Sequence, residues 1–255
     1  MSLFRNSKGE MPFLDHLEEL RWRILWSLLA IVIFTIIGFF IVTEFDVLGL
    51  LIAPIEPFLG DSKLKYLSPT APFFITLKLA LAVGFLFAGP VVIYQIWAFL
   101  SPALHATEKR AIVPALYFGL VLFMVGVAMA YYVALPVTLQ FTMSFQTESL
   151  EQSIVIEEYM SVVTRMLLAF GVVFEMPVVI LALTFIGLVT PEFLAEKRRH
   201  AIGIITVVAA LITPGNVLTL TVMMMVPLVL LYELSITLSR LIVRKRRLAE
   251  AAAQS

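Results

Sequence analysis

Apolar runs of about twenty residues recur along the chain, and they limit it to helices that cross a membrane. A bilayer offers no water to backbone amides, so a spanning segment must satisfy its hydrogen bonds internally, as a helix does. Hydrophobic residues make up 61% of the 255 residues and charged residues only 14%, too little charge for the surface of a soluble domain. We therefore predict an all-α integral membrane protein.

Six apolar segments can be delimited, and we predict one transmembrane helix in each of 22–42, 74–98, 111–134, 159–187, 201–213 and 217–238. The fifth segment corresponds to only about 20 Å of helix, against a hydrocarbon core of about 30 Å. We expect the fifth and sixth helices to be short, joined by a tight turn, and either to thin the bilayer or to re-enter it. Prolines predict bent helices that enclose a concave face, as in a cup: Pro90, Pro114, Pro177 and Pro227.

The basic residues orient the chain. With both termini in the cytoplasm, the inner stretches hold 14 lysines and arginines and the outer loops hold only Lys63 and Lys65. Basic residues accumulate on the cytoplasmic side of membrane proteins, so this orientation is favoured. We predict a single membrane domain over 1–255, with an amphipathic cytoplasmic helix at 1–21, a six-helix bundle at 22–238 and a basic cytoplasmic tail at 239–255.

The amphipathic helix before the first segment carries acids on its polar face. Glu19 and Arg23 are four residues apart in the favourable order for an ion pair, and Asp15 and Glu18 lie beside them. A salt-bridged surface helix would explain this pattern. Acids at the inner surface would, however, repel anionic lipid, so membrane anchoring is not their purpose.

The stretch 94–110 between the second and third segments is unusually aromatic. Ser101 followed by Pro102 predicts the start of a short helix, and Thr107 predicts a cap for the third long helix. Glu108 then lies in the first turn of that helix, where the helix dipole favours a carboxylate, at the same surface as Phe99. The alternative is a well-capped turn with aromatic anchors at the membrane interface.

Glu175 lies near the middle of the fourth segment, where an ionised carboxylate is costly and a function is the default hypothesis. The alternative is a neutral, hydrogen-bonded glutamic acid that fixes a kink at Pro177. Lys78 can extend toward the outer surface, and Glu233 can reach Arg240 or Thr237, so we interpret both as structural.

Motifs for catalysis and cofactors are missing from the sequence. The chain has no cysteine, no phosphate-binding loop, no paired-histidine zinc motif and no serine nucleophile motif. The three histidines are far apart in sequence: His16, His105 and His200. We therefore predict no catalytic residue, metal site or cofactor, and a protein that is not an enzyme.

Five motifs occur in order along nearly the whole chain: HLEELRWR at 16–23, SPTAPFF at 68–74, GPVVIYQIWAFLSPALHATEKR at 89–110, AFGVVFEMPV at 169–178 and ITPGNV at 212–217. Together they closely resemble TatC, the multi-span subunit of the twin-arginine protein translocase. The resemblance implies a cup-shaped bundle in the inner membrane with both termini cytoplasmic. It also implies a receptor for folded proteins that carry twin-arginine signal peptides, driven by the proton gradient.

The resemblance also implies site residues and partners. Glu19 and Glu108 match the acids that bind the arginine pair, and Phe99 matches an aromatic of the same surface. Glu175 matches an intramembrane acid or amide that docks single-span TatA- or TatB-type subunits, and Thr213 falls on the face of the last two spans that these subunits contact. Other TatC copies and membrane lipid are further expected partners, and nucleic acid is not. Asn216 stands where some members have an acid, which argues against a charge-dependent role there.

Two other functions remain open from the residues. One is a proton-coupled transporter of a small solute, with Glu175 as the proton carrier. The other is a purely structural scaffold that binds no signal peptide.

Overall fold

The computed structural model of the chain describes residues 13–60, 63–100, 112–144, 153–213 and 218–254. These residues form helices and, within the described ranges, no strand beyond one isolated bridge between Lys65 and Val155. The helices are α1 (Phe13–Glu44), α2 (Val47–Ile52), α3 (Glu56–Leu59), α4 (Ala71–Leu100), α5 (Ile112–Met129), the π-helix η3 (Ala130–Ala134), α6 (Leu135–Met143), α7 (Ile156–Phe174), α8 (Met176–Ile186), α9 (Pro191–Glu196), α10 (Arg198–Ile212) and α11 (Leu218–Gln254). The predicted all-α class is confirmed.

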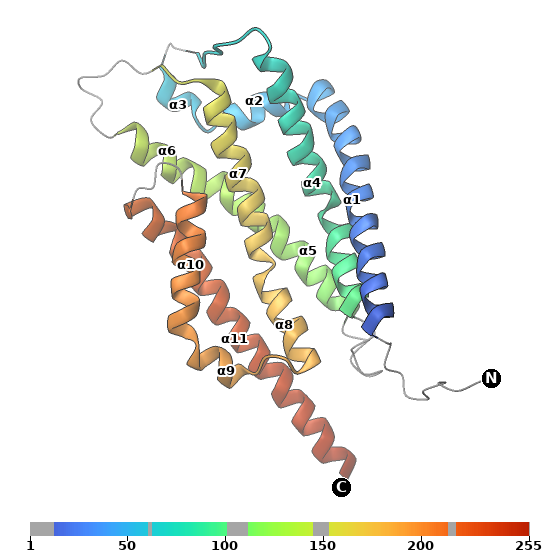
Figure 1. Cartoon of the computed structure of the whole chain (residues 1–255). Coiled ribbons are helices and arrows are strands. Elements are labelled where there is room, and N and C mark those ends of the chain that lie inside the picture. Colours follow the sequence, from blue (N-terminus) through green and yellow to red (C-terminus); the bar gives the residue numbers. More distant parts are fainter. Residues whose placement is uncertain (1–12, 61–62, 101–111, 145–152, 214–217, 255) are drawn as a thin grey trace, which may run out of the picture.

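The long helices stand side by side in one bundle (Figure 1). α1 and α4 form an antiparallel pair at one edge, α7 and α8 cross the middle, and α10 and α11 form a hairpin at the opposite edge. The beginning of α1 and the end of α11 lie at the same end of the bundle. The loop end of the α10–α11 hairpin stops well short of the level that α2 and α3 reach at the other end.

Five stretches are long and apolar enough to cross a membrane: Leu17–Glu44, Ala71–Phe99, Pro114–Met143, Ile156–Ile186 and Leu218–Arg244. They correspond to every predicted span except the fifth. α10 occupies that position with 15 residues, about 22 Å of helix, so the predicted short fifth helix is present but the count of six spans is not confirmed.

The expectation of a short sixth helix is wrong, because α11 has 37 residues. The apolar run ends near Leu238, but the residues that follow are mainly Arg, Lys, Leu, Ala and Glu, all strong helix formers. The helix therefore continues beyond the end of the apolar pattern from which its length was predicted.

Prolines bend the spans in different ways. Pro90 and Pro227 lie inside the continuous helices α4 and α11, whereas Pro177 follows the break between α7 and α8. Pro136 has no amide to donate, and the turn before it is a π-helix in which the Leu135 amide bonds to the Ala130 carbonyl.

Small residues bring α1 and α4 into close contact. A β-carbon on Gly84 would lie 2.5 Å from the backbone of Thr35, and one on Gly38 would lie 2.7 Å from the Ala80 carbonyl oxygen. Backbones approach this closely only where side chains are missing, so Gly38 and Gly84 lie on a packing face between the two helices. This contact fixes the relative position of the two helices.

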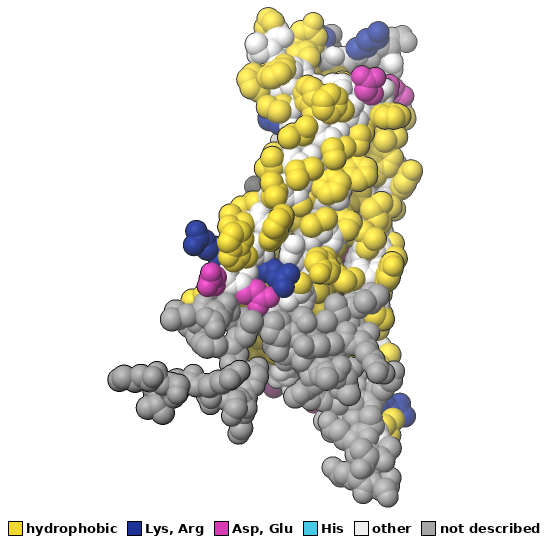
Figure 2. Space-filling view, turned by 90° about the vertical axis from the view of Figure 1, so that its right-hand side faces the viewer, with side chains coloured by type: hydrophobic (Ala, Val, Ile, Leu, Met, Phe, Trp, Pro, Cys, Tyr) yellow, Lys and Arg dark blue, Asp and Glu magenta, His cyan; other side chains and the backbone are white. Residues whose placement is uncertain are grey.

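The surface of the α1 edge has the pattern of a lipid-facing protein. Figure 2 shows hydrophobic side chains over the middle of this face and charged side chains near its two ends. Trp22, Trp26, Ile33 and Phe40 are among the exposed hydrophobic residues of α1. A contiguous apolar surface of this size marks a membrane contact in a chain that also has spans of the right length.

Candidate functional site

Glu19, Arg23 and Gln95 form a polar cluster at the end of the bundle where α1 begins. Arg23 donates to Glu19 Oε1 from Nη2 at 2.8 Å and from Nε at 3.3 Å, which confirms the predicted ion pair. The second terminal nitrogen, Nη1, donates to Gln95 Oε1 at 3.1 Å. We call these three residues the Glu19 cluster.

The Glu19 cluster is partly shielded from solvent, and it joins two helices. The side chains of Arg23 and Glu19 are 29% and 18% exposed. The rigid guanidinium fork bonds the carboxylate of its own helix on one side and an amide of α4 on the other. Glu19 is therefore held at the membrane surface in a fixed orientation.

Phe99 lies on the same face of α4 as Gln95, one turn nearer the end of that helix. Glu19 lies one turn before Arg23 on α1, and the two helices run antiparallel (Figure 1). Since Arg23 and Gln95 are in contact, Glu19 and Phe99 lie at about the same level of the bundle. The structure thus places two of the three predicted recognition residues at the same level of two neighbouring helices.

Trp97, between these positions, points the other way. Its side chain is 1% exposed and packs in a core cluster with Ile93, Leu122 and Phe123. It anchors α4 to α5 inside the protein and does not belong to an aromatic belt at the membrane interface.

Glu108 lies outside the described residues, as do Ser101, Pro102 and Thr107. The described helices on either side end at Leu100 and begin at Ile112, both at the end of the bundle that holds the Glu19 cluster. The second carboxylate predicted for the arginine pair thus stays a prediction.

Glu175 forms the joint between α7 and α8. It ends α7 and precedes α8, and its amide bonds to the Val172 carbonyl oxygen at 3.1 Å. A β-carbon on Gly119 of α5 would lie 2.9 Å from Glu175 Oε2, so the absence of a side chain there makes room for the carboxyl group.

The surroundings of this carboxyl group are apolar. Oε1 of Glu175 is buried and has no hydrogen-bond partner among the described residues. The hydrogen bond to a freed backbone carbonyl, expected if Glu175 only fixed the kink, is absent from this part of the chain. Ile93 and Val178 line the same contact with Gly119, so the other described neighbours at this point are apolar.

Thr213 ends α10, and its side chain is 3% exposed. Its hydroxyl group donates to the Ala209 carbonyl oxygen at 2.8 Å. Leu211, two residues earlier, is exposed, whereas the side chain of Thr213 is turned into the protein, and the docking role of Thr213 stays a prediction. Asn216 lies outside the described residues.

Two contacts in the structure were not predicted from the sequence. Gln95 was not singled out, although a polar residue near the end of an apolar segment is a usable signal. The carboxylate of Glu233 pairs with Arg198, and not with Arg240 or Thr237 as expected, through two bonds of 2.7 and 2.8 Å that join the beginning of α10 to α11. Among the described residues no group of three acidic or histidine side chains could hold a metal ion.

Comparisons with known proteins agree on one family. The family model described as Sec-independent protein translocase protein (TatC) matches residues 15–227. TatC of Aquifex aeolicus is 41% identical over 239 residues, 93% of this chain and 98% of the relative. TatC of Escherichia coli is 37% identical over 92% of this chain and 91% of its own length. A crystal structure described as the twin arginine translocase receptor TatC superposes with a TM-score of 0.79 at 41% identity, over 89% of this chain and 98% of that one.

Proposed function

The chain belongs to the TatC family of Sec-independent protein translocase proteins, and on this basis we propose that it binds twin-arginine signal peptides at the Glu19 cluster. Family membership makes it a multi-pass membrane protein and the core subunit of the translocase. The observation that carries the proposal is a carboxylate held at a membrane surface by Arg23, whose guanidinium group is itself bonded to Gln95.

The chemistry of the arginine pair suits this carboxylate. A guanidinium group is permanently charged and presents a fork of donors that matches the two oxygens of a carboxylate. We infer that a signal-peptide arginine bonds to the carboxylate beside Arg23, which keeps the group oriented.

A lysine in the signal would bind less well. Its ammonium group is a compact, strongly hydrated charge without the planar fork, so it cannot form the same pair of parallel bonds. Phe99, at the level of Glu19, offers an aromatic face beside this carboxylate. Glu108 supplies the carboxylate for the second arginine in our proposal.

The orientation and the partners complete the proposal. We place both termini in the cytoplasm and the protein in the inner membrane, because basic residues gather at the end that carries the Glu19 cluster. Single-span TatA- or TatB-type subunits dock at Glu175 and along α10 and α11, and the proton gradient drives export. In this proposal the chain is a receptor without enzymatic activity.

Photo-crosslinking of a twin-arginine peptide to the full chain in membranes tests the proposal. Glu19→Gln keeps the size of the side chain and removes its charge, so we expect peptide crosslinking to fall by at least about tenfold, the loss of one charge-assisted bond of roughly 1.5–3 kcal/mol. Glu18→Gln is the matched control, since Glu18 is adjacent and exposed. Equal crosslinking in both variants would contradict the assignment of Glu19.

A further inference from the structure

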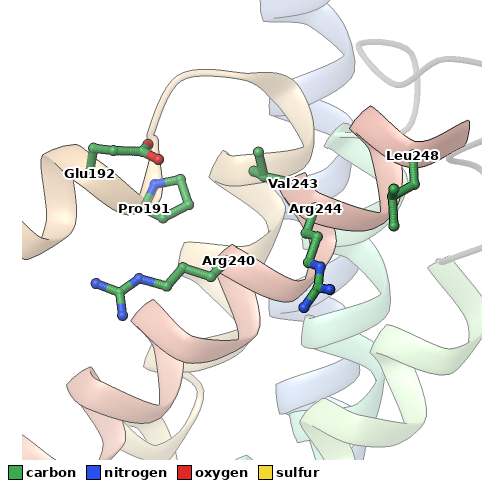
Figure 3. A pocket seen from close by; sticks show the side chains of 6 residues that line it. All are labelled: Pro191, Glu192, Arg240, Val243, Arg244 and Leu248. Atoms are coloured by element: carbon green, nitrogen blue, oxygen red, sulfur yellow. The ribbon is translucent and has the colours of Figure 1, made fainter. Parts of the chain in front are cut away.

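A small cavity lies between α9 and the final turns of α11 at the same end of the bundle. It has a volume of about 200 Å³, and Figure 3 shows its lining: Pro191, Glu192, Arg240, Val243, Arg244 and Leu248. We call it the Arg240 pocket. Arg240 extends alongside Pro191 and Glu192, and Arg244 projects from the next turn of α11. Two guanidinium groups therefore border one cavity.

The charged side chains that line this pocket form no ion pair with other described residues. In the described part of the chain neither Arg240 nor Arg244 forms an ion pair, and neither does Glu192. Two neighbouring basic side chains are paired: Arg198 with Glu233, and Lys197 with Glu196. The two arginines stand four residues apart on one face of α11, and their side chains point in different directions, so both turn toward the cavity when they share one anion.

The pocket lies where α11 leaves the membrane. The apolar run of this helix ends near Leu238, and the sequence continues with the basic residues Arg240, Arg244, Lys245, Arg246 and Arg247. Val243, Leu248 and Pro191 give the cavity an apolar side. A phosphate group bound here would be surrounded by basic side chains. The apolar side of the cavity would contact the parts of the same ligand molecule that enter the bilayer.

We propose that the Arg240 pocket binds the headgroup of an anionic phospholipid from the leaflet at this end, the inner leaflet in the proposed orientation. One phosphodiester lies between the guanidinium groups of Arg240 and Arg244, which donate charge-assisted hydrogen bonds to its oxygens. The lipid backbone then contacts Val243 and Leu248. Basic pockets between spanning helices on the cytoplasmic side commonly bind acidic lipid headgroups in this way.

Glu192 limits which headgroups fit. Its carboxylate can accept hydrogen bonds from the hydroxyl groups of a glycerol headgroup, and it repels a second phosphate. The pocket is therefore suited to a lipid with one phosphodiester and a hydroxylated headgroup, of which phosphatidylglycerol is the simplest. An acidic peptide would fit the charges, but it would gain little from an apolar wall at the membrane surface.

Native mass spectrometry of the full chain in a neutral detergent tests the proposal, with phosphatidylglycerol, phosphatidylcholine and inorganic phosphate as separate probes. Each arginine near a lipid surface contributes about 1 kcal/mol, which corresponds to roughly fivefold in affinity. We expect Arg240→Gln with Arg244→Gln to weaken phosphatidylglycerol binding about 25-fold and to leave the thermal unfolding temperature unchanged, because both side chains are exposed.

The matched control is Arg21→Gln with Arg199→Gln, which removes the same charge from exposed positions at the same end. Equal weakening of phosphatidylglycerol binding in both double variants would overturn the proposal, because binding would then depend on the total positive charge at this end of the protein and not on the Arg240 pocket. Displacement of the lipid by inorganic phosphate at similar concentration would overturn the lipid as the occupant. Glu192→Gln should raise the affinity for cardiolipin several-fold relative to phosphatidylglycerol, and an unchanged ratio would refute the role given to Glu192.

Discussion

Gly84→Ala tests the contact that holds the Glu19 cluster together. The added β-carbon would lie 2.5 Å from both the amide nitrogen and the α-carbon of Thr35, and these backbone atoms cannot rotate away as a side chain can. α1 and α4 must therefore separate. Overpacking of this kind costs about 1–3 kcal/mol, and we expect the upper part of that range because the clash is with backbone.

Gly203→Ala supplies the control for this substitution. Gly203 lies inside α10, and a β-carbon there would have nothing within 4 Å. Both variants gain the same helix propensity, about 0.8–1.0 kcal/mol for glycine to alanine, so the difference between them isolates the cost of the clash. That difference should be about 2–3 kcal/mol in favour of Gly203→Ala.

Thermal unfolding in detergent, followed by tryptophan fluorescence, measures the difference in stability. The same samples can be tested for peptide crosslinking, which should fall in Gly84→Ala because Arg23 loses its contact with Gln95. If Gly84→Ala unfolds at the same temperature as Gly203→Ala, α1 and α4 are not packed as described, and the orientation of Glu19 would need another explanation.

Three further predictions concern other contacts of the bundle. Tyr159→Phe removes the 2.7 Å hydrogen bond from the buried hydroxyl group to the Leu51 carbonyl oxygen. In thermal unfolding it should destabilise the protein by roughly 1–3 kcal/mol. Tyr132→Phe, at a 74% exposed position, is the control and should be neutral. Glu175→Gln preserves the volume of the side chain beside Gly119, so a single-span partner should still co-purify with this variant. Glu175→Ala should lose most of the co-purified partner. Equal loss in both variants would indicate that the proton of the carboxyl group is required. Arg198→Gln should leave the thermal unfolding temperature nearly unchanged, since both members of its pair with Glu233 are nearly half exposed. A double-mutant cycle with Glu233→Gln should show little coupling.

Local patterns predicted the parts of the structure that depend on residues close in sequence. The apolar runs identified α1, α4, α5 and α7, and the spacing of four residues identified the Glu19–Arg23 pair. Gln95 is 72 residues from Arg23, and Glu233 is 35 residues from Arg198, so neither contact has a local signal. Both depend on which faces of two helices meet, and this is decided by packing.

The direction in which a single side chain points could not be predicted from the sequence, for the same reason. Trp97 and Phe99 are two residues apart in one aromatic stretch, yet α5 and α8 cover Trp97, while Phe99 remains half-buried near α1. Likewise, the end of the apolar run after Leu238 does not end α11, because basic residues outside the bilayer are also good helix formers.

The break at Glu175 divides the fourth predicted span into two helices that pack against different neighbours. α7 packs mainly against α5, whereas α8 packs mainly against α11, and one residue connects them. α8 is 11 residues long, about 16 Å, so a rotation of about 5° at this joint would move its far end by about 1.4 Å. A small change in the space around one carboxyl group, beside a glycine that leaves just enough room for it, would thus be passed along α8 to the helix that it packs against, α11.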